Sequence, residues 1–512
     1  MEMQTERRGA ARWGRALAFT VLFGIVIRVV MQAYPPIEPV YQYILSLPYA
    51  AFSALVFCDT PVRAQRGYRL LLLCLIWAVL TSFLHTYEFD GVTKLAAYFL
   101  MMLFSLGMCY PMAFVLPEAQ ARRAYTAVAA AFVAGIAALS ALGCYTAVMR
   151  VMIENPGRGQ YEPMGVVFGR LSIFAYPTAA AVFCALALLL AAYLFWNSRR
   201  ALVRTLLVLA GAVIFVALAL TGGRIASVLL CVCLGGVAYL LAETKLTARS
   251  PALRALLAVC AAGVCALVCY ALLSGAVKGV NALSDVVAQK EVSVTVSALS
   301  APAEAVFVRQ APPLAAEEAG ADAPDVGDEP DAFADADKFG TETKNRSLLS
   351  GLSTLQGRTY AWEGALRALA SDPMLLLFGS SPVLVMERVD PFVPENTEAV
   401  GFFHLHSIYF QTLVSFGVIG FLLFALAAGY ILFHAARLFF CGRERCTVAE
   451  RTLPLLLVFC LGVDLLEVFL TFTDATKMSN PLFFLTAGMV VYLSTSRIPK
   501  RPAKAKNAAR GD

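Results

Sequence analysis

The sequence is poor in charged residues. Only 15% of its 512 residues are Asp, Glu, Lys or Arg, whereas about a quarter is usual for a soluble domain. Apolar residues make up 59% of the chain, and the mean hydropathy is +0.71. This composition excludes a disordered chain, an ordinary soluble enzyme and a nucleic-acid-binding protein. It predicts a polytopic membrane protein.

A nucleotide-binding phosphate loop is also missing. The sequence contains no Gly-rich loop ending in Gly-Lys-Ser or Gly-Lys-Thr, and the pair Gly235-Gly236 lies inside an apolar run. A transporter driven by ATP needs such a loop to hold the phosphates. The sequence therefore argues against ATP-driven transport.

Apolar runs of membrane-spanning length recur along the chain. A spanning helix needs about 20 mostly apolar residues, and about twelve such runs are bounded by charge or by Pro and Gly. We expect an all-α polytopic integral membrane protein. The predicted spans are 17–34, 39–58, 69–87, 92–115, 122–149, 173–196, 201–220, 224–242, 252–274, 408–434, 453–472 and 480–495.

The basic residues predict the orientation of these spans. Most of the 41 Lys and Arg residues fall in the N-terminal segment, in every second connection and in the basic tail 496–512. Lys and Arg are enriched in cytoplasmic connections. Both termini are therefore expected in the cytoplasm. The net charge of +6 is then mainly a property of the inner membrane face and implies no nucleic acid partner.

One connection is far longer than the others. Residues 1–274 form a predicted nine-helix region and 408–495 hold three further helices, so the loop 275–407 is expected outside the cytoplasm. This loop carries 19 acidic residues against 9 basic ones. Its part 300–345, rich in Ala, Pro, Asp and Glu, lacks the apolar residues needed to fold. We interpret 300–345 as a disordered acidic insertion.

The part 346–372 of this loop differs in pattern. Trp362, Leu366 and Leu369 are spaced to share one face of a helix, and Glu363 and Arg367 form an i,i+4 pair. Asp372-Pro373 is expected to end that helix. The pattern predicts a short amphipathic helix on the outer membrane surface.

The cysteines avoid the outer loop. None of the 13 lies in 275–407, so no disulfide framework is expected in the oxidising compartment. Those in spans, such as Cys231 and Cys233, are interpreted as small buried apolar residues.

Two of only four histidines stand together before the span 408–434. His404 and His406 are candidates for a general base acting near neutral pH, although loop histidines are often merely solvated. Zinc binding by the pair is weakly supported because no third ligand stands nearby in the sequence.

Outward-facing arginines and a membrane carboxylate pair complete the candidates. Arg224 lies in a very short outer connection, where it either binds an anion or snorkels to the interface. Arg358 opens the amphipathic helix and Arg170 precedes the sixth span; the planar guanidinium suits phosphate oxygens. Asp464 and Glu467 share one helical face. They are either functional or paired with a buried base such as Arg28.

Three short runs together resemble a known family. They are Gly-Arg-Thr-Tyr-Ala-Trp-Glu-Gly-Ala-Leu at 357–366, followed by Asp372-Pro373 and Phe378-Gly379; His-Ser-Ile-Tyr-Phe-Gln at 406–411, followed by Gly417 and Gly420; and Thr-Gly-Gly-Arg at 221–224. In their order and placement they are similar to motifs of the bacterial O-antigen ligase and O-antigen polymerase superfamily. The resemblance covers roughly residues 170–435.

The resemblance implies a reaction. Members of the family move a glycan from an undecaprenyl-pyrophosphate carrier to an acceptor hydroxyl, on a glycan or a lipid-linked acceptor, without nucleotide sugar, metal or other cofactor. It implies His406 as catalytic base and Arg224, Arg358 and Arg170 as pyrophosphate-binding residues. Supporting residues would be His404, Tyr409, Gln411, Trp362, Asp464 and Glu467. The site would face outward in the bacterial cytoplasmic (inner) membrane, in cell-surface polysaccharide assembly.

Two other functions are compatible with the sequence. A transporter or flippase of lipid-linked sugars would also need many spans, although such proteins usually show repeated halves with charges at mid-membrane. A non-enzymatic surface-assembly protein would use the long loop to bind a partner.

Overall fold

The computed structural model describes residues 2–33, 38–85, 98–149, 152–155, 160–163, 166–167, 170–172, 177–245, 251–289, 295–296, 356–382, 384–394, 405, 407–466 and 479–498. Almost all of these residues are helical. The predicted insertion 300–345 lies outside the described residues.

The first part of the chain supplies most of the long helices. They are α1 (Glu2–Ala33), α2 (Glu38–Cys58), α3 (Thr60–Arg63), α4 (Arg66–His85), the π-helix η2 (Leu103–Cys109), α6 (Met112–Val115), α7 (Glu118–Val148), α8 (Pro177–Asn197), α9 (Ala201–Thr221), α10 (Arg224–Lys245) and α11 (Pro251–Gln289). The last of these is longer than the predicted span 252–274.

The second part begins with short helices and ends with long ones. They are α13 (Gln356–Ser371), α14 (Pro373–Phe378), α15 (Val385–Val389), the 3₁₀ helix η4 (Asp390–Phe392), α16 (Ile408–Cys441), α17 (Val448–Leu466) and α18 (Ser479–Arg497).

Five short strands accompany the helices. They are β1 (Met152–Asn155), β2 (Gln160–Pro163), β3 (Val166–Val167), β4 (Arg170–Leu171) and β5 (Thr295–Val296). Strand β1 pairs antiparallel with β2 and parallel with β5, and β3 pairs antiparallel with β4. These strands were not expected from the sequence, because they are too short to show an alternating pattern.

Nine helical segments among the described residues are long and apolar enough to cross a membrane. The chain is therefore a polytopic helical membrane protein. The predicted spans 39–58, 453–472 and 480–495 coincide with α2, α17 and α18, which are helical but fall outside these nine. In α17 the charged residues Glu450, Arg451 and Asp464 reduce its apolar character.

The helices also differ in how deeply they are buried. Helices α8, α17 and α18 are buried along nearly their whole length, so neighbouring helices rather than lipid surround their polar groups. Helices α9 and α11 have only 17% and 11% of their apolar windows buried. Such an exposed apolar surface suits contact with lipid tails.

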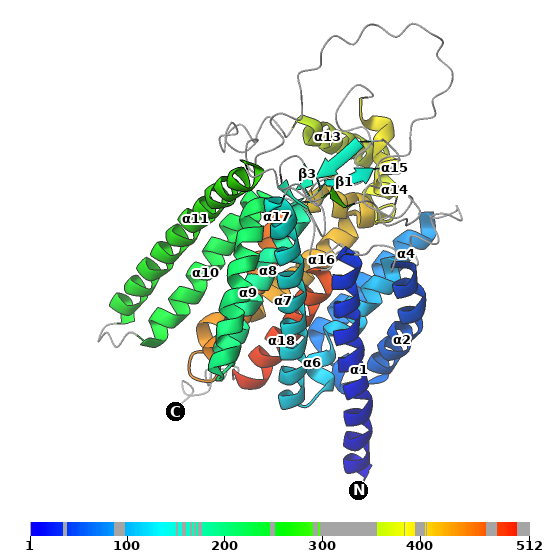
Figure 1. Ribbon diagram of the computed structural model, residues 1–512. Helices are drawn as coiled ribbons and strands as arrows, with labels where there is room; N and C mark the ends of the chain where they lie inside the picture. Colours follow the sequence, from blue (N-terminus) through cyan, green and yellow to red (C-terminus); the bar gives the residue numbers. More distant parts are fainter. Residues whose placement is uncertain are drawn as a thin grey trace, which may run out of the picture.

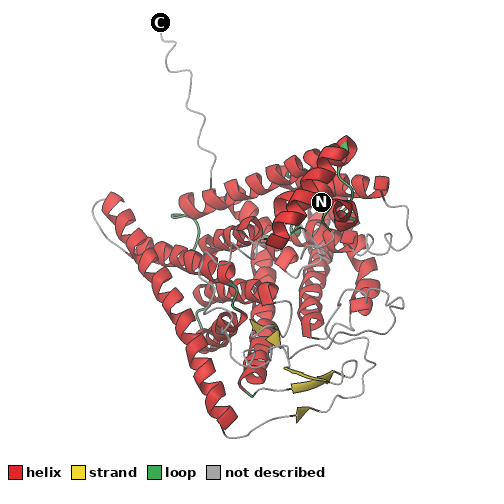
Figure 2. Cartoon of the chain, turned by 90° about the horizontal axis from the view of Figure 1, so that it is seen from above, coloured by secondary structure: helices red, strands yellow, loops and turns green. Residues whose placement is uncertain are grey.

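The helices form one bundle with two different ends. The start of α1 and the end of α18 lie at one end, and α13, α14, α15 and the strands gather at the opposite end (Figure 1). Viewed from above, the few strands lie together at one side of the bundle (Figure 2). We call the end with α13–α15 the loop end and the end with the start of α1 and the end of α18 the terminal end.

The short helix α13 packs on neighbouring protein through a face made mostly of alanine. Ala361, Ala365, Ala368 and Leu369 are buried against α15, η4 and α16, whereas Leu366 is 54% exposed. The small alanine side chains permit close packing on these neighbours, which gives α13 a protein-facing surface.

Two local features of α13 agree with the sequence analysis. An ion pair of 2.5 Å joins Arg367 to Glu363. The helix ends before Asp372, whose carboxylate accepts hydrogen bonds from the backbone N–H groups of Met374 and Leu375 at 2.8 and 3.2 Å. Asp372 thereby caps the next helix, α14, in which Pro373 takes the favourable first position.

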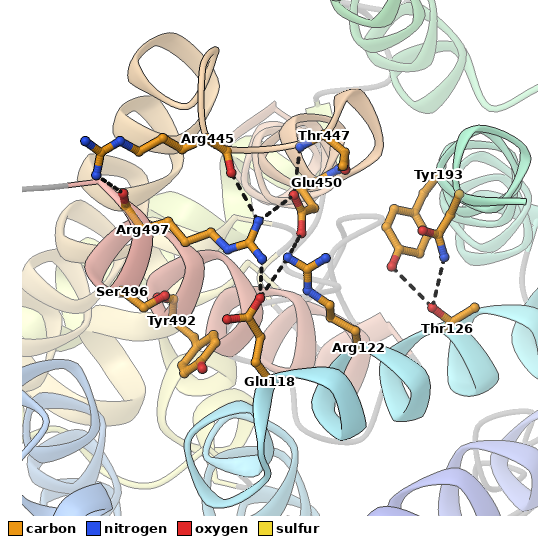
Figure 3. A network of polar contacts seen from close by, with 11 residues as sticks. Glu118, Arg122, Thr126, Tyr193, Arg445, Thr447, Glu450, Tyr492, Ser496 and Arg497 are labelled. Atoms are coloured by element: carbon orange, nitrogen blue, oxygen red, sulfur yellow. Dashed lines mark hydrogen bonds and ion pairs between the residues drawn. The ribbon is translucent and has the colours of Figure 1, made fainter.

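A network of ion pairs joins helices at the terminal end of the bundle (Figure 3). Arg122 pairs with Glu118 at 2.9 Å and with Glu450, and Arg497 pairs with Glu118 and with Glu450, the latter at 3.3 Å. Glu450 also accepts a hydrogen bond of 2.8 Å from the backbone of Thr447, whose hydroxyl accepts one from the Glu450 backbone. This capping box starts α17, so the network joins α7, α17 and α18.

Candidate functional site

The turn between α9 and α10 brings two predicted arginines together. Helix α9 ends at Thr221, and Gly222 caps it with left-handed backbone angles of φ 62° and ψ 17°. Arg170, on β4, donates from Nε to the Thr221 carbonyl oxygen at 2.7 Å. Its side chain lies against Gly222. Arg224 follows at once as the first residue of α10.

The hydrogen bond of Arg170 has a clear physical role. The last carbonyl groups of a helix lack intrahelical donors and carry partial negative charge. A guanidinium at the Thr221 carbonyl satisfies one of these groups and holds the turn in place. Arg170 is therefore a positioning residue for the segment that presents Arg224.

Of these two arginines, Arg224 is the better candidate for binding a ligand. It is half-buried, and among the described residues no carboxylate forms an ion pair with it. It stands at the N-terminus of a 22-residue helix, where the backbone adds partial positive charge. The arrangement suits the binding of an anion.

Asp464 lies toward the same end as Arg224. Gly462 of α17 faces the side chain of Leu229 of α10, and Gly236 of α10 faces Leu455 of α17. The two helices therefore run antiparallel, so that α17 approaches its C-terminus where α10 begins. Asp464 is 1% exposed and lies about 3 Å beyond Gly462 along the axis. Its predicted partner residue Glu467 lies outside the described residues.

A clamp around Leu405 forms the second part of the site. The indole Nε1–H of Trp362 donates to the Leu405 carbonyl oxygen at 2.7 Å, and the Leu405 backbone N–H donates to the Gln411 side-chain oxygen at 3.1 Å. Leu405 is fully buried. The Trp362 ring stacks on Phe410 with centroids 5.8 Å apart. Both backbone polar groups of Leu405 thus have side-chain partners.

The clamp is important because Leu405 lies between the two candidate histidines in the sequence. His404 and His406 are its two neighbours, and both lie outside the described residues. The carbonyl that Trp362 binds belongs to the peptide bond that leads into His406. Trp362 and Gln411, predicted as supporting residues, therefore hold the backbone between the two histidines. Tyr409 is 46% exposed and takes no part in the clamp.

Helix α16, which begins just after the clamp in the sequence, is interrupted at Gly417. Gly417 departs from helical geometry with φ 65° and ψ −176°, and Gly379 has φ 80°. The two glycines meet where the α14–α15 connection crosses α16. A Cβ on Gly417 would stand 2.3 Å from the Leu377 carbonyl oxygen, and one on Gly379 would stand 2.4 Å from the Phe416 nitrogen. Only residues without a side chain allow this approach.

The carbonyl groups around the break find other donors. The Val414 carbonyl accepts hydrogen bonds from the Ser380 backbone and hydroxyl at 2.8 and 3.1 Å. The Phe416 carbonyl accepts from the Trp77 indole at 2.8 Å. A helix break leaves such carbonyls without partners, so these bonds stabilise it. These bonds hold residues 408–416, the part of α16 that precedes the break.

The structure describes the remaining predicted site residues only in part. Arg358 falls in the first turn of α13, but its side chain lies outside those described. Within the described parts of the chain no three metal-ligating side chains come together. Sequence reasoning missed Ser380 and Trp77, whose roles depend on contacts between segments distant in the chain.

Comparison with known protein families gives a match. Residues 209–425 match the family model described as O-antigen ligase, a segment that contains Arg224, Arg358, Trp362, His406 and both sides of the α16 break. No curated protein and no solved structure matches the chain. The match confirms the resemblance seen in the motifs. Residues 209–425 of the chain are therefore similar to the O-antigen ligase family.

Proposed function

We propose that this protein is a membrane glycosyltransferase of cell-surface polysaccharide assembly. It transfers a glycan from an undecaprenyl-pyrophosphate carrier to an acceptor hydroxyl at the outer face of the bacterial cytoplasmic membrane. The observation that carries the proposal is that the turn before Arg224 and the backbone next to His406 belong to one matched segment. A side-chain hydrogen bond holds each of them, from Arg170 to the Thr221 carbonyl and from Trp362 to the Leu405 carbonyl.

The proposed chemistry needs an anion-binding group and a base. His406 accepts the proton of the acceptor hydroxyl, and the hydroxyl oxygen forms a bond to the anomeric carbon of the donor sugar. The bond from that carbon to the pyrophosphate oxygen breaks, and undecaprenyl pyrophosphate leaves with the electron pair. Arg224, together with Arg358, neutralises the charge that develops on the leaving group.

Arg170 contributes indirectly to this step. Its Nε–H is bound to the Thr221 carbonyl, so we assign it the positioning of the α9–α10 turn in addition to any charge that it offers the donor. Asp464, buried near the start of α10, supplies negative charge on the same side and orients the basic groups.

The transfer reaction is tested directly with the purified protein. We expect the wild type to release undecaprenyl pyrophosphate from a lipid-linked glycan and to elongate or attach the glycan. Arg224→Ala is expected to slow transfer by about 10²-fold, in the range for loss of one transition-state donor. Arg224→Lys should restore only part of it, because an ammonium replaces a planar bidentate group.

The matched control is Arg388→Ala, an exposed arginine of α15, which is expected to leave transfer within about 2-fold. A purified protein that moves lipid-linked glycan across vesicles without forming a new glycosidic bond would support the flippase alternative and refute the proposal. In a deletion strain, single-repeat decoration would identify a polymerase, and accumulated lipid-linked polymer a ligase.

The outward orientation is tested by reporter fusions. Because basic residues are concentrated at the terminal end, that end is expected in the cytoplasm and the loop end outside. A periplasmic-type phosphatase fused after Ser300 should be active, and the same enzyme fused after Arg443, in the α16–α17 connection, should be inactive. The reverse pattern would place the site on the cytoplasmic side and contradict the proposal.

A further inference from the structure

A pocket of about 300 Å³ is lined by residues of α1, by the residue that follows α6 and by the first turns of α7. The first turns of α7 lie toward the terminal end of the bundle (Figure 1). The lining residues are Arg15, Ala18, Leu116, Gln120 and Arg123. The pocket thus combines two basic groups, one amide and two apolar side chains, and it contains no acidic residue.

The two arginines are not used by the ion-pair network of Figure 3. Arg122 points into that network toward Glu118 and Glu450. Arg123, its neighbour in α7, has no ion pair among the described residues, and the same holds for Arg15. Both are exposed, so two guanidinium groups face the pocket without a carboxylate to neutralise them.

Gln120 adds an acceptor to the same pocket. Its side-chain oxygen is buried and has no hydrogen-bond partner among the described residues. A buried polar atom without a partner costs free energy, and a hydroxyl-bearing ligand in the pocket would satisfy it. The lining therefore favours a ligand that has both negative charge and a hydroxyl donor.

An apolar stripe leads away from the pocket along α1. Phe19, Phe23, Val26 and Val30 are exposed at 68%, 42%, 38% and 43%. They follow Arg15 at intervals of four, eight, eleven and fifteen residues, which places all five on one face of the helix. The rings of Phe19 and Phe23 stack in parallel, 6.2 Å apart. A ligand with an apolar tail can continue from the pocket along this surface.

We propose that this pocket binds the headgroup of an anionic phospholipid in the inner leaflet. The phosphate lies between Arg15 and Arg123, a headgroup hydroxyl donates to the side-chain oxygen of Gln120, and one acyl chain lies along the stripe from Phe19 to Val30. Basic pockets between helices at the cytoplasmic face recognise such headgroups. The inference rests on the proposed orientation of the bundle, but not on the proposed glycosyl transfer.

Lipid binding is measured by native mass spectrometry of the full-length protein in detergent. The probes are phosphatidylglycerol, phosphatidylcholine, tail-free glycerol phosphate and inorganic phosphate. We expect the wild type to retain phosphatidylglycerol at least about 10-fold better than the other three. The double substitution Arg15→Gln/Arg123→Gln should lower its affinity for phosphatidylglycerol about 10-fold or more, since each arginine near the surface contributes substantially to anionic lipid binding.

The matched control is Arg199→Gln/Arg200→Gln, which removes two exposed arginines at the start of α9, outside the pocket. This control should bind phosphatidylglycerol within about 2-fold of the wild type. Arg15→Lys/Arg123→Lys keeps the charges and should show a smaller loss; it replaces the glutamine variant if that variant does not fold. Equal losses in the control and pocket variants, or unchanged binding in the pocket variants, would refute the site. Tail-free glycerol phosphate or inorganic phosphate binding as tightly as the lipid would refute the lipid assignment.

Discussion

Replacing Gly417 by alanine is expected to remove most of the folded protein. The backbone at Gly417 has φ 65° and ψ −176°, a region that is essentially restricted to glycine. The new Cβ would also stand 2.3 Å from the Leu377 carbonyl oxygen, and that oxygen belongs to the backbone of α14. Strain and overpacking together should destabilise the fold by at least about 3 kcal/mol.

The measurement is the melting temperature and the yield of monodisperse protein in detergent. The same helix offers a matched control, Gly429, around which nothing lies within 4 Å of an added Cβ. Gly429→Ala should be neutral or stabilising by up to about 1 kcal/mol, because alanine favours the helix over glycine. If Gly417→Ala melted at the same temperature as Gly429→Ala, the break in α16 would not be the constraint described above.

Gly379→Ala gives an independent check of the same contact. Its Cβ would stand 2.4 Å from the Phe416 nitrogen, and its φ is 80°. The substitution acts on the opposite side of the crossing, so its effect should be similar in size to that of Gly417→Ala.

These glycines illustrate how far the sequence could predict the structure. Phe378-Gly379 and Gly417 both belong to runs that resemble the O-antigen ligase family, so they were recognisable as motif positions. The reason why these positions require glycine was not recognisable from the sequence. It is a backbone contact between α14 and α16, and no local pattern reports which two segments of a chain will cross. Trp362 and Gln411 were likewise predicted as supporting residues, but their common partner, the Leu405 backbone, appears only in three dimensions.

The helical class followed from composition because lipid requires long apolar helices. Local polarity was harder to interpret. Arg451 is 1% exposed, pairs with Glu243 at 2.7 Å and also donates to the Phe439 carbonyl. In the sequence, Arg451 is simply one of the basic residues in the connection between the predicted spans 408–434 and 453–472. A buried ion pair depends on a partner about two hundred residues away in the chain, so a charge count along the sequence cannot reveal it.

His406→Ala is expected to reduce glycan transfer more than any other single substitution. A general base contributes about 10²–10⁴-fold to rate, and the proposed step requires a neutral imidazole to accept the acceptor proton. Transfer by the wild type should therefore decline as the pH falls through about 6–7, where histidine becomes protonated. The residual activity of His406→Ala should lack this decline. The measurement is the rate of transfer by purified protein between pH 5 and 9.

Trp362→Phe separates positioning from catalysis. It keeps an aromatic ring against Phe410 but removes the hydrogen bond of 2.7 Å to the Leu405 carbonyl. Losing that bond leaves a buried acceptor unsatisfied, at a cost of about 1–3 kcal/mol, so the backbone beside His406 is held less firmly. We expect kcat to fall about 10-fold while the decline at acidic pH is retained, because the base itself is still present.

Substitution of His404 tests which of the two histidines is the general base. His404→Ala should leave the rate of transfer within about 5-fold of the wild type, because the proposal assigns proton acceptance to His406 and no chemical step to His404. If His404→Ala abolished the acidic decline and His406→Ala retained it, the base would be His404. Either result would leave the Leu405 clamp intact, since Trp362 and Gln411 bind the backbone of the residue between the two. A pH profile unaffected by both substitutions would refute histidine catalysis in this protein.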